Sequence, residues 1–100
     1  MLQTSFSDFT GFDWDDGNID KNRIRHEVEC YECEQVFFNK PIVVLPDKNH
    51  SSIKKRLSAL GITDGGRLMT IIFTIRHSLI WVISARDMNK KERSFYRNYE

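Results

Sequence analysis

Two tight-turn signals divide the second half of the sequence into short apolar segments, and they constrain the fold more than any other feature. Asp64-Gly65-Gly66 is a strong hairpin signal, and Arg76-His77-Ser78 is a second tight turn. Strands joined by turns this short pair in an antiparallel fashion. We therefore expect a four-stranded antiparallel meander over residues 42–45, 54–60, 67–75 and 79–85.

Three helices are expected around this sheet, over residues 15–26, 29–38 and 89–99. The first begins with adjacent aspartates, which cap free N–H groups at a helix start. The second must end before Pro41, because the residue preceding a proline disfavours a helix. Asn89 and Glu92 have the spacing of a capping box and begin the third. The expected fold class is thus α+β, with two N-terminal helices, a four-stranded antiparallel meander sheet and a C-terminal helix.

Length and composition fit one domain. The chain has 100 residues, of which 40% are hydrophobic, enough for a packed core. We interpret residues 12–100 as a single domain and residues 1–11 as a loosely ordered tail, and 12–14 alternate as a short strand would. The N-terminus does not resemble a signal peptide, and no apolar run reaches the ~20 residues of a membrane span. We expect a cytoplasmic protein that does not bind membranes.

The small net charge of +1 conceals two halves of opposite charge. Residues 1–47 carry four basic and ten acidic side chains, whereas residues 48–100 carry eleven basic and four acidic ones. The basic half contains most of the expected strands and the C-terminal helix. If the fold keeps the halves apart, one face of the molecule is basic and suited to a nucleic acid.

Cys30 and Cys33 form a single C-x-x-C pair. A structural zinc site needs four ligands, and no second cysteine pair or pair of spaced histidines follows. On a helix the two thiols share a face with Phe37, so we interpret them as small core residues. The sequence therefore predicts no metal site and no cofactor.

Two arginines of the last hairpin are the first candidates for binding an anion. If Arg76-His77 forms a two-residue loop, Arg67 lies opposite Arg86. Facing guanidinium groups repel each other unless an anion compensates, and their forks suit phosphate oxygens. Arg76 and Lys54 extend this basic surface. The alternative interpretation is an ordinary solvated sheet edge.

Asn22, Arg25 and His26 share one face of the expected first helix. An imidazole there suits proton transfer or a phosphate contact, although a lone histidine is more often a packing or surface residue. His50, in a turn, is the reserve candidate for proton transfer. Trp81 is one of several aromatic residues that can stack on unpaired RNA bases, although most aromatic residues in a small domain belong to its core.

Motifs that cover residues 12–96 nearly without a gap occur in the order of one known family. They include Phe12-Asp13-Trp14-Asp15, Arg25-His26, Val36-Phe37, Leu45-Pro46-Asp47, Ala59-Leu60-Gly61, Gly66-Arg67-Leu68, Phe73-Thr74-Ile75-Arg76, Ile83-Ser84-Ala85-Arg86 and Glu92-Arg93 with Tyr96. In these motifs the chain resembles the BrnT toxins. The resemblance implies a RelE-like fold and the ribonuclease toxin of a type II toxin–antitoxin pair, which arrests translation. It also implies a BrnA-type ribbon-helix-helix antitoxin, through which alone the pair reaches operator DNA.

Three positions depart from the family pattern. The family usually has Lys where this chain has Asn18, Gly where it has Glu27, and commonly Arg where it has Trp81. The loss of two positive charges can weaken RNA cleavage. An alternative function is therefore a weakened toxin homologue that acts mainly as an antitoxin-binding partner and operon co-repressor. Direct DNA binding by this chain is less favoured, because no expected helix carries a run of base-reading side chains.

The leading hypothesis is metal-independent RNA cleavage, in which the 2′-OH attacks the adjacent phosphorus. Arg67 and Arg86 are assigned to stabilising the charged transition state, and His26, with Arg25 beside it, to proton transfer. Substrate binding is assigned to Asn22, His50, Lys54, Arg76 and Trp81.

Overall fold

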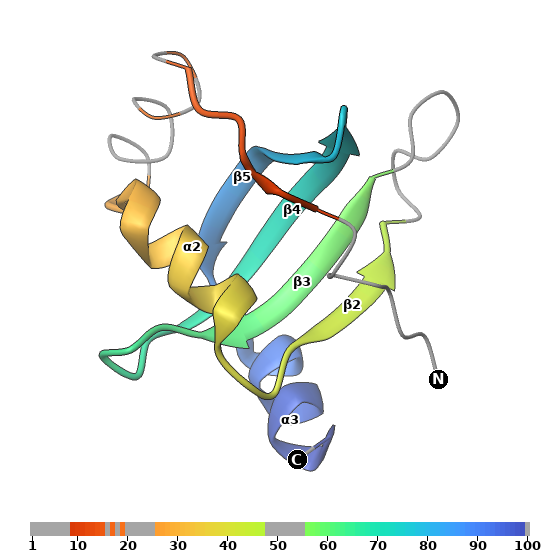
Figure 1. Ribbon diagram of the computed structural model, residues 1–100. Coiled ribbons are helices and arrows are strands. Elements are labelled where there is room, and N and C mark those ends of the chain that lie inside the picture. The colour runs from red at the N-terminus through yellow and green to blue at the C-terminus, as the bar shows by residue number, and fades with distance from the viewer. Residues whose placement is uncertain (1–8, 16, 18, 20–25, 48–55, 100) are drawn as a thin grey trace.

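The computed structural model describes residues 9–15, 17, 19, 26–47 and 56–99. Within these residues, two helices flank one five-stranded sheet with the strand order β1-β5-β4-β3-β2 (Figure 1). In chain order the elements are β1 Gly11–Phe12, α2 Cys30–Phe38, β2 Val43–Pro46, β3 Leu57–Ile62, β4 Leu68–Arg76, β5 Leu79–Asp87 and α3 Lys90–Tyr99. The strands from β2 to β5 are antiparallel neighbours, whereas β1 runs parallel to β5.

The sheet is not the expected four-stranded antiparallel meander, because a fifth strand joins it from the N-terminal region. Gly11 of β1 lies opposite Leu79 of β5. The Thr10 N–H donates to the Ser78 carbonyl at 2.7 Å and extends this pairing. Phe9 packs against the hydrophobic core. The last residues of the expected N-terminal tail are therefore packed, and the earlier ones lie outside the described part of the chain.

The expected pair of N-terminal helices is not seen, because α2 is the one helix before β2 whose bounds lie in the part of the chain that the structure describes. Gly17, Ile19 and His26 are the described residues outside α2 that have a helical assignment there. The helix expected over 15–26 falls largely on residues outside that part. The expected second helix is confirmed as α2. It starts after Glu29, whose backbone N–H donates to Glu32 Oε1 at 3.0 Å in a capping box. It ends at Phe38, three residues before Pro41.

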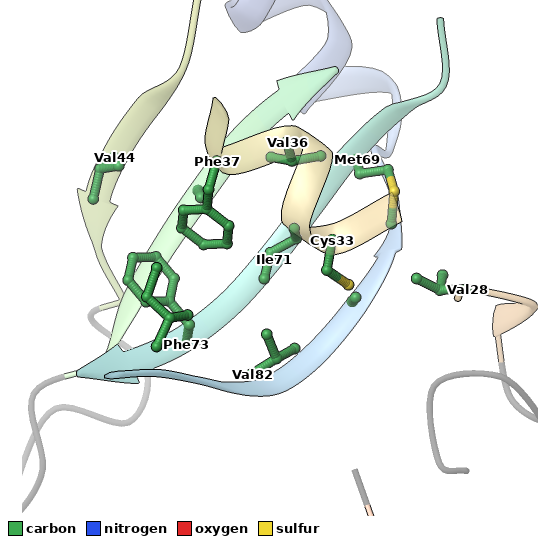
Figure 2. Close-up of a cluster of buried hydrophobic side chains, with 12 residues drawn as sticks. Val28, Cys33, Val36, Phe37, Val44, Met69, Ile71, Phe73 and Val82 are labelled. Carbon is green, nitrogen blue, oxygen red and sulfur yellow. The ribbon is translucent and has the colours of Figure 1, made fainter. Parts of the chain in front are cut away.

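α2 packs across one face of the sheet, and this face holds the larger hydrophobic core (Figure 2). The buried side chains of the helix are Cys33, Val36 and Phe37. The rings of Phe37 and Phe73 meet edge to face, with centroids 4.9 Å apart. The close approach of the helix depends on Gly61 of β3, because a Cβ there would lie 2.6 Å from Val36 Cγ1.

Both hairpin turns use left-handed backbone conformations. The β3–β4 turn lies at the predicted Asp64-Gly65-Gly66, and Gly66 has a φ of 91°. In the β4–β5 turn, His77 and Ser78 have φ values of 53° and 64°. Two consecutive positive φ values are typical of a type I′ turn. The second turn therefore begins one residue later than the expected Arg76-His77 loop.

A bulge then changes the pairing of β4 with β5. The register shifts in the middle of the strands, where β5 carries one extra residue, Ile83. As a result, Thr70 lies opposite Arg86. The expected pairing of Arg67 with Arg86 is wrong, because the later turn and the bulge both displace the register.

α3 packs against the other face of the sheet, at one of its ends (Figure 1). Alternate residues of β2 divide between the two faces: Val44 joins the core under α2, whereas Val43 packs with Tyr96 of α3. The Tyr96 hydroxyl donates to the Pro41 carbonyl at 2.6 Å. We call this side the α3 face, and its residues on β4 and β5 include Thr70, Ile72, Thr74, Trp81 and Arg86.

Candidate functional site

Arg86 is held on the α3 face by a carboxylate of α3. Its Nη1 and Nη2 atoms donate to Oε1 and Oε2 of Glu92 at 2.8 and 3.0 Å. Nη1 also donates to the Asp87 carbonyl at 3.1 Å. A phosphate can accept the same bidentate fork as a carboxylate. Since the Arg86 side chain is 36% exposed, the guanidinium stands at a surface that an anionic ligand can reach.

Glu92 connects the first turn of α3 to the sheet. Besides the Arg86 fork, its carboxylate accepts hydrogen bonds from the Thr70 hydroxyl at 2.8 Å and the Asn89 N–H at 2.9 Å. The Glu92 N–H donates back to Asn89 Oδ1 at 2.8 Å, which confirms the predicted capping box. Burial raises the pKa of Glu92, but the hydrogen bonds from Arg86, Asn89 and Thr70 outweigh it, so the pKa lies below its ordinary value. The capping spacing alone did not indicate the bond to Arg86.

Arg76 and Trp81 form a second basic group towards the other end of the α3 face. The guanidinium carbon of Arg76 lies 4.1 Å from the centre of the indole, a cation–π contact. Arg76 Nη2 is also 3.6 Å from Asp13 Oδ2. Trp81 lies opposite Thr74 of β4, and Arg86 lies opposite Thr70, four residues earlier on the same strand. The two groups therefore lie ~13 Å apart along the strands.

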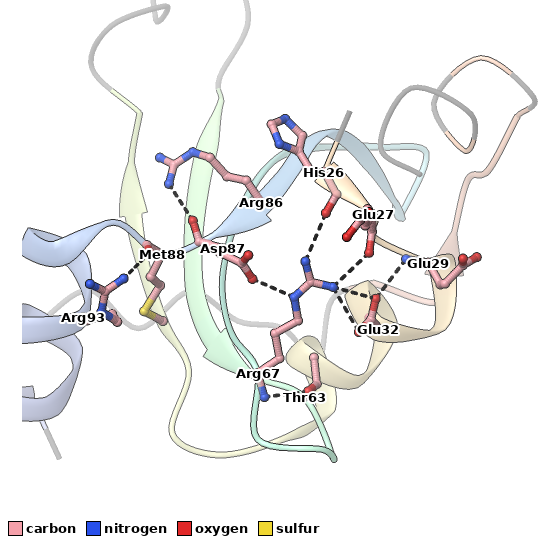
Figure 3. Close-up of polar contacts among 10 residues, drawn as sticks. All are labelled: His26, Glu27, Glu29, Glu32, Thr63, Arg67, Arg86, Asp87, Met88 and Arg93. Carbon is pink, nitrogen blue, oxygen red and sulfur yellow. Dashed lines mark hydrogen bonds and ion pairs between the residues drawn. The ribbon is translucent and has the colours of Figure 1, made fainter. Parts of the chain in front are cut away.

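Arg67, just before β4, lies in a separate network on the α2 side (Figure 3). Its Nε donates to Asp87 Oδ1 at 2.6 Å, and its Nη2 donates to the His26 carbonyl at 3.0 Å. Nη1 donates to the Glu27 carbonyl and to Glu32 Oε1, each at 3.0 Å. The hydrogen bond to Asp87 is the largest cause that raises the pKa of Arg67, so the guanidinium stays charged.

Asp87 links the networks of the two arginines through different atoms. Its carboxylate accepts from Arg67, and its backbone carbonyl accepts from Arg86 (Figure 3). The sequence argument that these arginines need an external anion does not hold, because carboxylates of this chain compensate both. Glu32 and Glu92 come from the two helices, 35 and 6 positions away from the arginines that they bind.

The remaining candidates are divided between described and undescribed residues. His26 is half-buried, and its imidazole points away from the Arg67 network (Figure 3). Four predicted site residues lie outside the described part of the chain: Asn22, Arg25, His50 and Lys54. Arg67 thus contacts the backbone of His26 on the α2 side. Arg86, Arg76 and Trp81 lie on the α3 face.

The thiols and carboxylates in the described part of the chain form no metal centre. Burial raises the pKa of Cys33 to about 12, in keeping with its interpretation as a core residue, and Cys30 and Cys33 are not joined by a disulfide. Among the residues described, no three His, Cys, Asp or Glu side chains gather in a group that could hold a metal ion. In the same part of the chain, no helix has the length and apolar character needed to cross a membrane.

The fold and the site define a small α+β domain whose sheet carries guanidinium groups on one face. A family model described as the ribonuclease toxin, BrnT, of type II toxin-antitoxin systems matches residues 14–92. The chain therefore belongs to the BrnT family, as its motifs indicated, and this family assigns it to type II toxins with ribonuclease activity and a protein antitoxin. No curated protein matches the chain.

Proposed function

We propose that this toxin cleaves RNA without a metal ion, by attack of the 2′-OH on the adjacent phosphorus. The observation that carries the proposal is the Arg86 fork, 36% exposed on the α3 face. The attack places additional negative charge on the phosphate oxygens, and a fixed guanidinium stabilises that charge. A phosphate oxygen can share the fork with Glu92 or displace its carboxylate, because both anions can present two oxygens to the two terminal nitrogens of arginine.

Other residues of the site bind RNA or transfer protons in this proposal. Arg76 contacts the backbone and Trp81 a base, ~13 Å along the strands from Arg86. His26 is the candidate that exchanges a proton with the 2′-OH or the 5′ leaving oxygen. Sequence grounds alone support further roles for Asn22, Arg25, His50 and Lys54.

The proposed protein partner is a BrnA-type antitoxin with a ribbon-helix-helix fold. The family supports a protein antitoxin in general terms. The resemblance of the chain to BrnT toxins supports the specific type, and operator DNA is then bound by the antitoxin and not by this chain. Co-expression with a tagged BrnA-type antitoxin should yield a stable complex and restore growth.

RNA cleavage by the purified chain tests the proposed reaction. Wild-type protein should cleave RNA in EDTA and leave 2′,3′-cyclic phosphate ends. Arg86→Ala should lower the cleavage rate by about 10²- to 10³-fold. Arg97→Ala, a charge-matched control on the exposed end of α3, should retain the wild-type rate. Loss of activity in EDTA that Mg²⁺ restores, or full activity of Arg86→Ala, would contradict the proposal.

A weakened toxin that acts mainly as a co-repressor is the second candidate. Glu92 already occupies both terminal nitrogens of Arg86, and Trp81 stands where the family commonly has Arg. Expression of the chain alone separates the two candidates. An active toxin stops growth, whereas a weakened one permits growth and still binds the antitoxin.

A further inference from the structure

Arg67 is bonded to three segments of the chain that are distant in sequence. All three of its guanidinium nitrogens donate hydrogen bonds. The acceptors belong to the end of β5 (Asp87), the first turn of α2 (Glu32) and the backbone before α2 (the carbonyls of His26 and Glu27). The planar fork of arginine can reach these acceptors at once, which the point charge of lysine cannot.

The backbone that Arg67 holds has an uncommon conformation. Glu27 has a φ of 56°, in the left-handed region that side chains other than glycine seldom adopt. The carbonyl before Glu27, which belongs to His26, and the carbonyl of Glu27 itself both accept hydrogen bonds from the Arg67 guanidinium. The Arg67 contacts therefore fix the path of the chain at the residue that carries the candidate imidazole.

The charge around Arg67 disfavours a phosphate. Two carboxylates, Glu32 and Asp87, bind its single positive charge, so the group of three is net negative. The Arg86 and Glu92 pair, by contrast, is neutral, and the exposed cation Lys91 directly precedes Glu92 in α3. An RNA backbone approaching Arg67 would meet a carboxylate on each side of it.

We propose that Arg67 is a positioning residue, which fixes the His26–Glu27 backbone and through it His26, and that it does not contact RNA. The inference rests on the proposed RNA cleavage. It predicts that loss of Arg67 affects the cleavage rate and the RNA affinity differently. Loss of Arg67 lets His26 leave its position without removing a phosphate contact, so the cleavage rate falls while RNA affinity stays the same.

The salt dependence of RNA binding distinguishes positioning from contact. An arginine that binds one phosphate of single-stranded RNA contributes about 0.7 to the slope of log affinity against log salt. Arg67→Ala should leave this slope and the RNA affinity unchanged, while single-turnover cleavage falls on the order of 100-fold, as a misplaced group can cause. Arg76→Ala should lower the slope by about 0.7. A lower slope in Arg67→Ala would overturn the inference.

Glu32→Gln is an independent test, because the two possible roles of Arg67 predict opposite effects of this substitution on cleavage. If Arg67 contacts RNA, removing the Glu32 charge should strengthen RNA binding and leave cleavage intact or faster. If Arg67 is a positioning residue, Glu32→Gln should slow cleavage as Arg67→Ala does, because it weakens the same network. Arg67→Lys should remain slow, since its ammonium cannot reproduce the fork. Faster cleavage by Glu32→Gln, or wild-type cleavage by Arg67→Lys, would contradict the inference.

A control of matched stability separates positioning from general destabilisation. Val44→Ala removes a buried core contact far along the chain from the network. Assayed well below both unfolding temperatures, Val44→Ala should cleave at the wild-type rate and Arg67→Ala should not. Equal rates in the two variants would overturn the inference.

Amide hydrogen exchange tests the network without any RNA. Exchange at residues 26–29 should quicken at least tenfold in Arg67→Ala and stay unchanged in Val44→Ala. If wild-type protein cleaves no RNA but shows this exchange pattern, the proposed function fails and the positioning contact stands. If wild-type protein cleaves RNA and exchange at 26–29 is unaffected by Arg67→Ala, the positioning inference alone fails.

Discussion

The two faces of the sheet use the same strands for different purposes. Under α2, twelve buried side chains of the described residues form one cluster, in which the rings of Phe37 and Phe73 pack edge to face. On the α3 face, four buried residues cluster near the helix, while Arg86 and Ile72 stay partly exposed. Because side chains alternate along a strand, neighbouring residues of β4 belong to opposite faces. We therefore expect that single substitutions one residue apart can change stability and the proposed RNA chemistry separately.

The sharpest test of this comparison uses two adjacent isoleucines of β4. Ile71 is fully buried under α2, whereas Ile72 is half-buried on the α3 face. Ile71→Ala should lower the free energy of unfolding by about 2–5 kcal/mol, through lost burial and a cavity. Ile72→Ala should cost less than half as much. Urea unfolding measures both, and equal losses would show that the two faces are packed alike.

Gly61→Ala tests how tightly α2 lies on its face. The added Cβ would be 2.6 Å from Val36 Cγ1, so the helix must shift or the side chain must move. We expect a loss of about 1–3 kcal/mol in the free energy of unfolding. Val36→Ala in the same chain should recover part of it. Gly65→Ala is the matched control, because its nearest contact, Thr63 Oγ1, is 4.0 Å away.

Glu92→Gln tests the ionic contact of the α3 face. At pH 7 the variant should be less stable than wild type by about 1 kcal/mol, because a neutral amide binds Arg86 more weakly than a carboxylate. The folded-state pKa of Glu92 is lowered, so its contribution is present above the ordinary pKa of a glutamate and is lost as the pH falls through the folded pKa. Urea midpoints of the two proteins should converge in acid. A difference that persists at pH 2 would exclude this cause.

The smallest expected effect concerns Glu27. Its φ of 56° suits glycine better than glutamate, so Glu27→Gly should raise the free energy of unfolding by about 0.5 kcal/mol. The Arg67 bond goes to the backbone carbonyl and survives the change. Thermal unfolding measures the gain. A loss of stability would mean that the Glu27 side chain makes a contact that outweighs its backbone conformation.

Local signals predicted the helix ends and the turns. Pro41 limits α2, and the Asn89 and Glu92 pair starts α3, because a proline and a capping box act within a few residues of their own position. Asp64-Gly65-Gly66 forms a turn for the same reason. Each of these features is decided by short-range sterics or by hydrogen bonds between near neighbours.

Contacts between distant residues were beyond the reach of such signals. The pairing of Gly11 with Leu79 and the bond from Arg67 to Glu32 join positions 68 and 35 residues apart, and no periodicity encodes them. The bulge at Ile83 was equally hidden, because an extra residue in a strand leaves the apolar pattern almost unchanged. The sequence therefore indicated Arg67 and Arg86 as candidates, but it did not predict Glu32 and Glu92 as their partners.

The place of Asp87 has a consequence for what a substitution there can change. Its carboxylate accepts a hydrogen bond from Arg67, whereas its backbone carbonyl accepts one from Arg86. A mutation at this position replaces the carboxylate but keeps the carbonyl. Under the proposed roles, a substitution at position 87 therefore changes the contact that positions His26, and it leaves in place the backbone acceptor of the arginine on the α3 face.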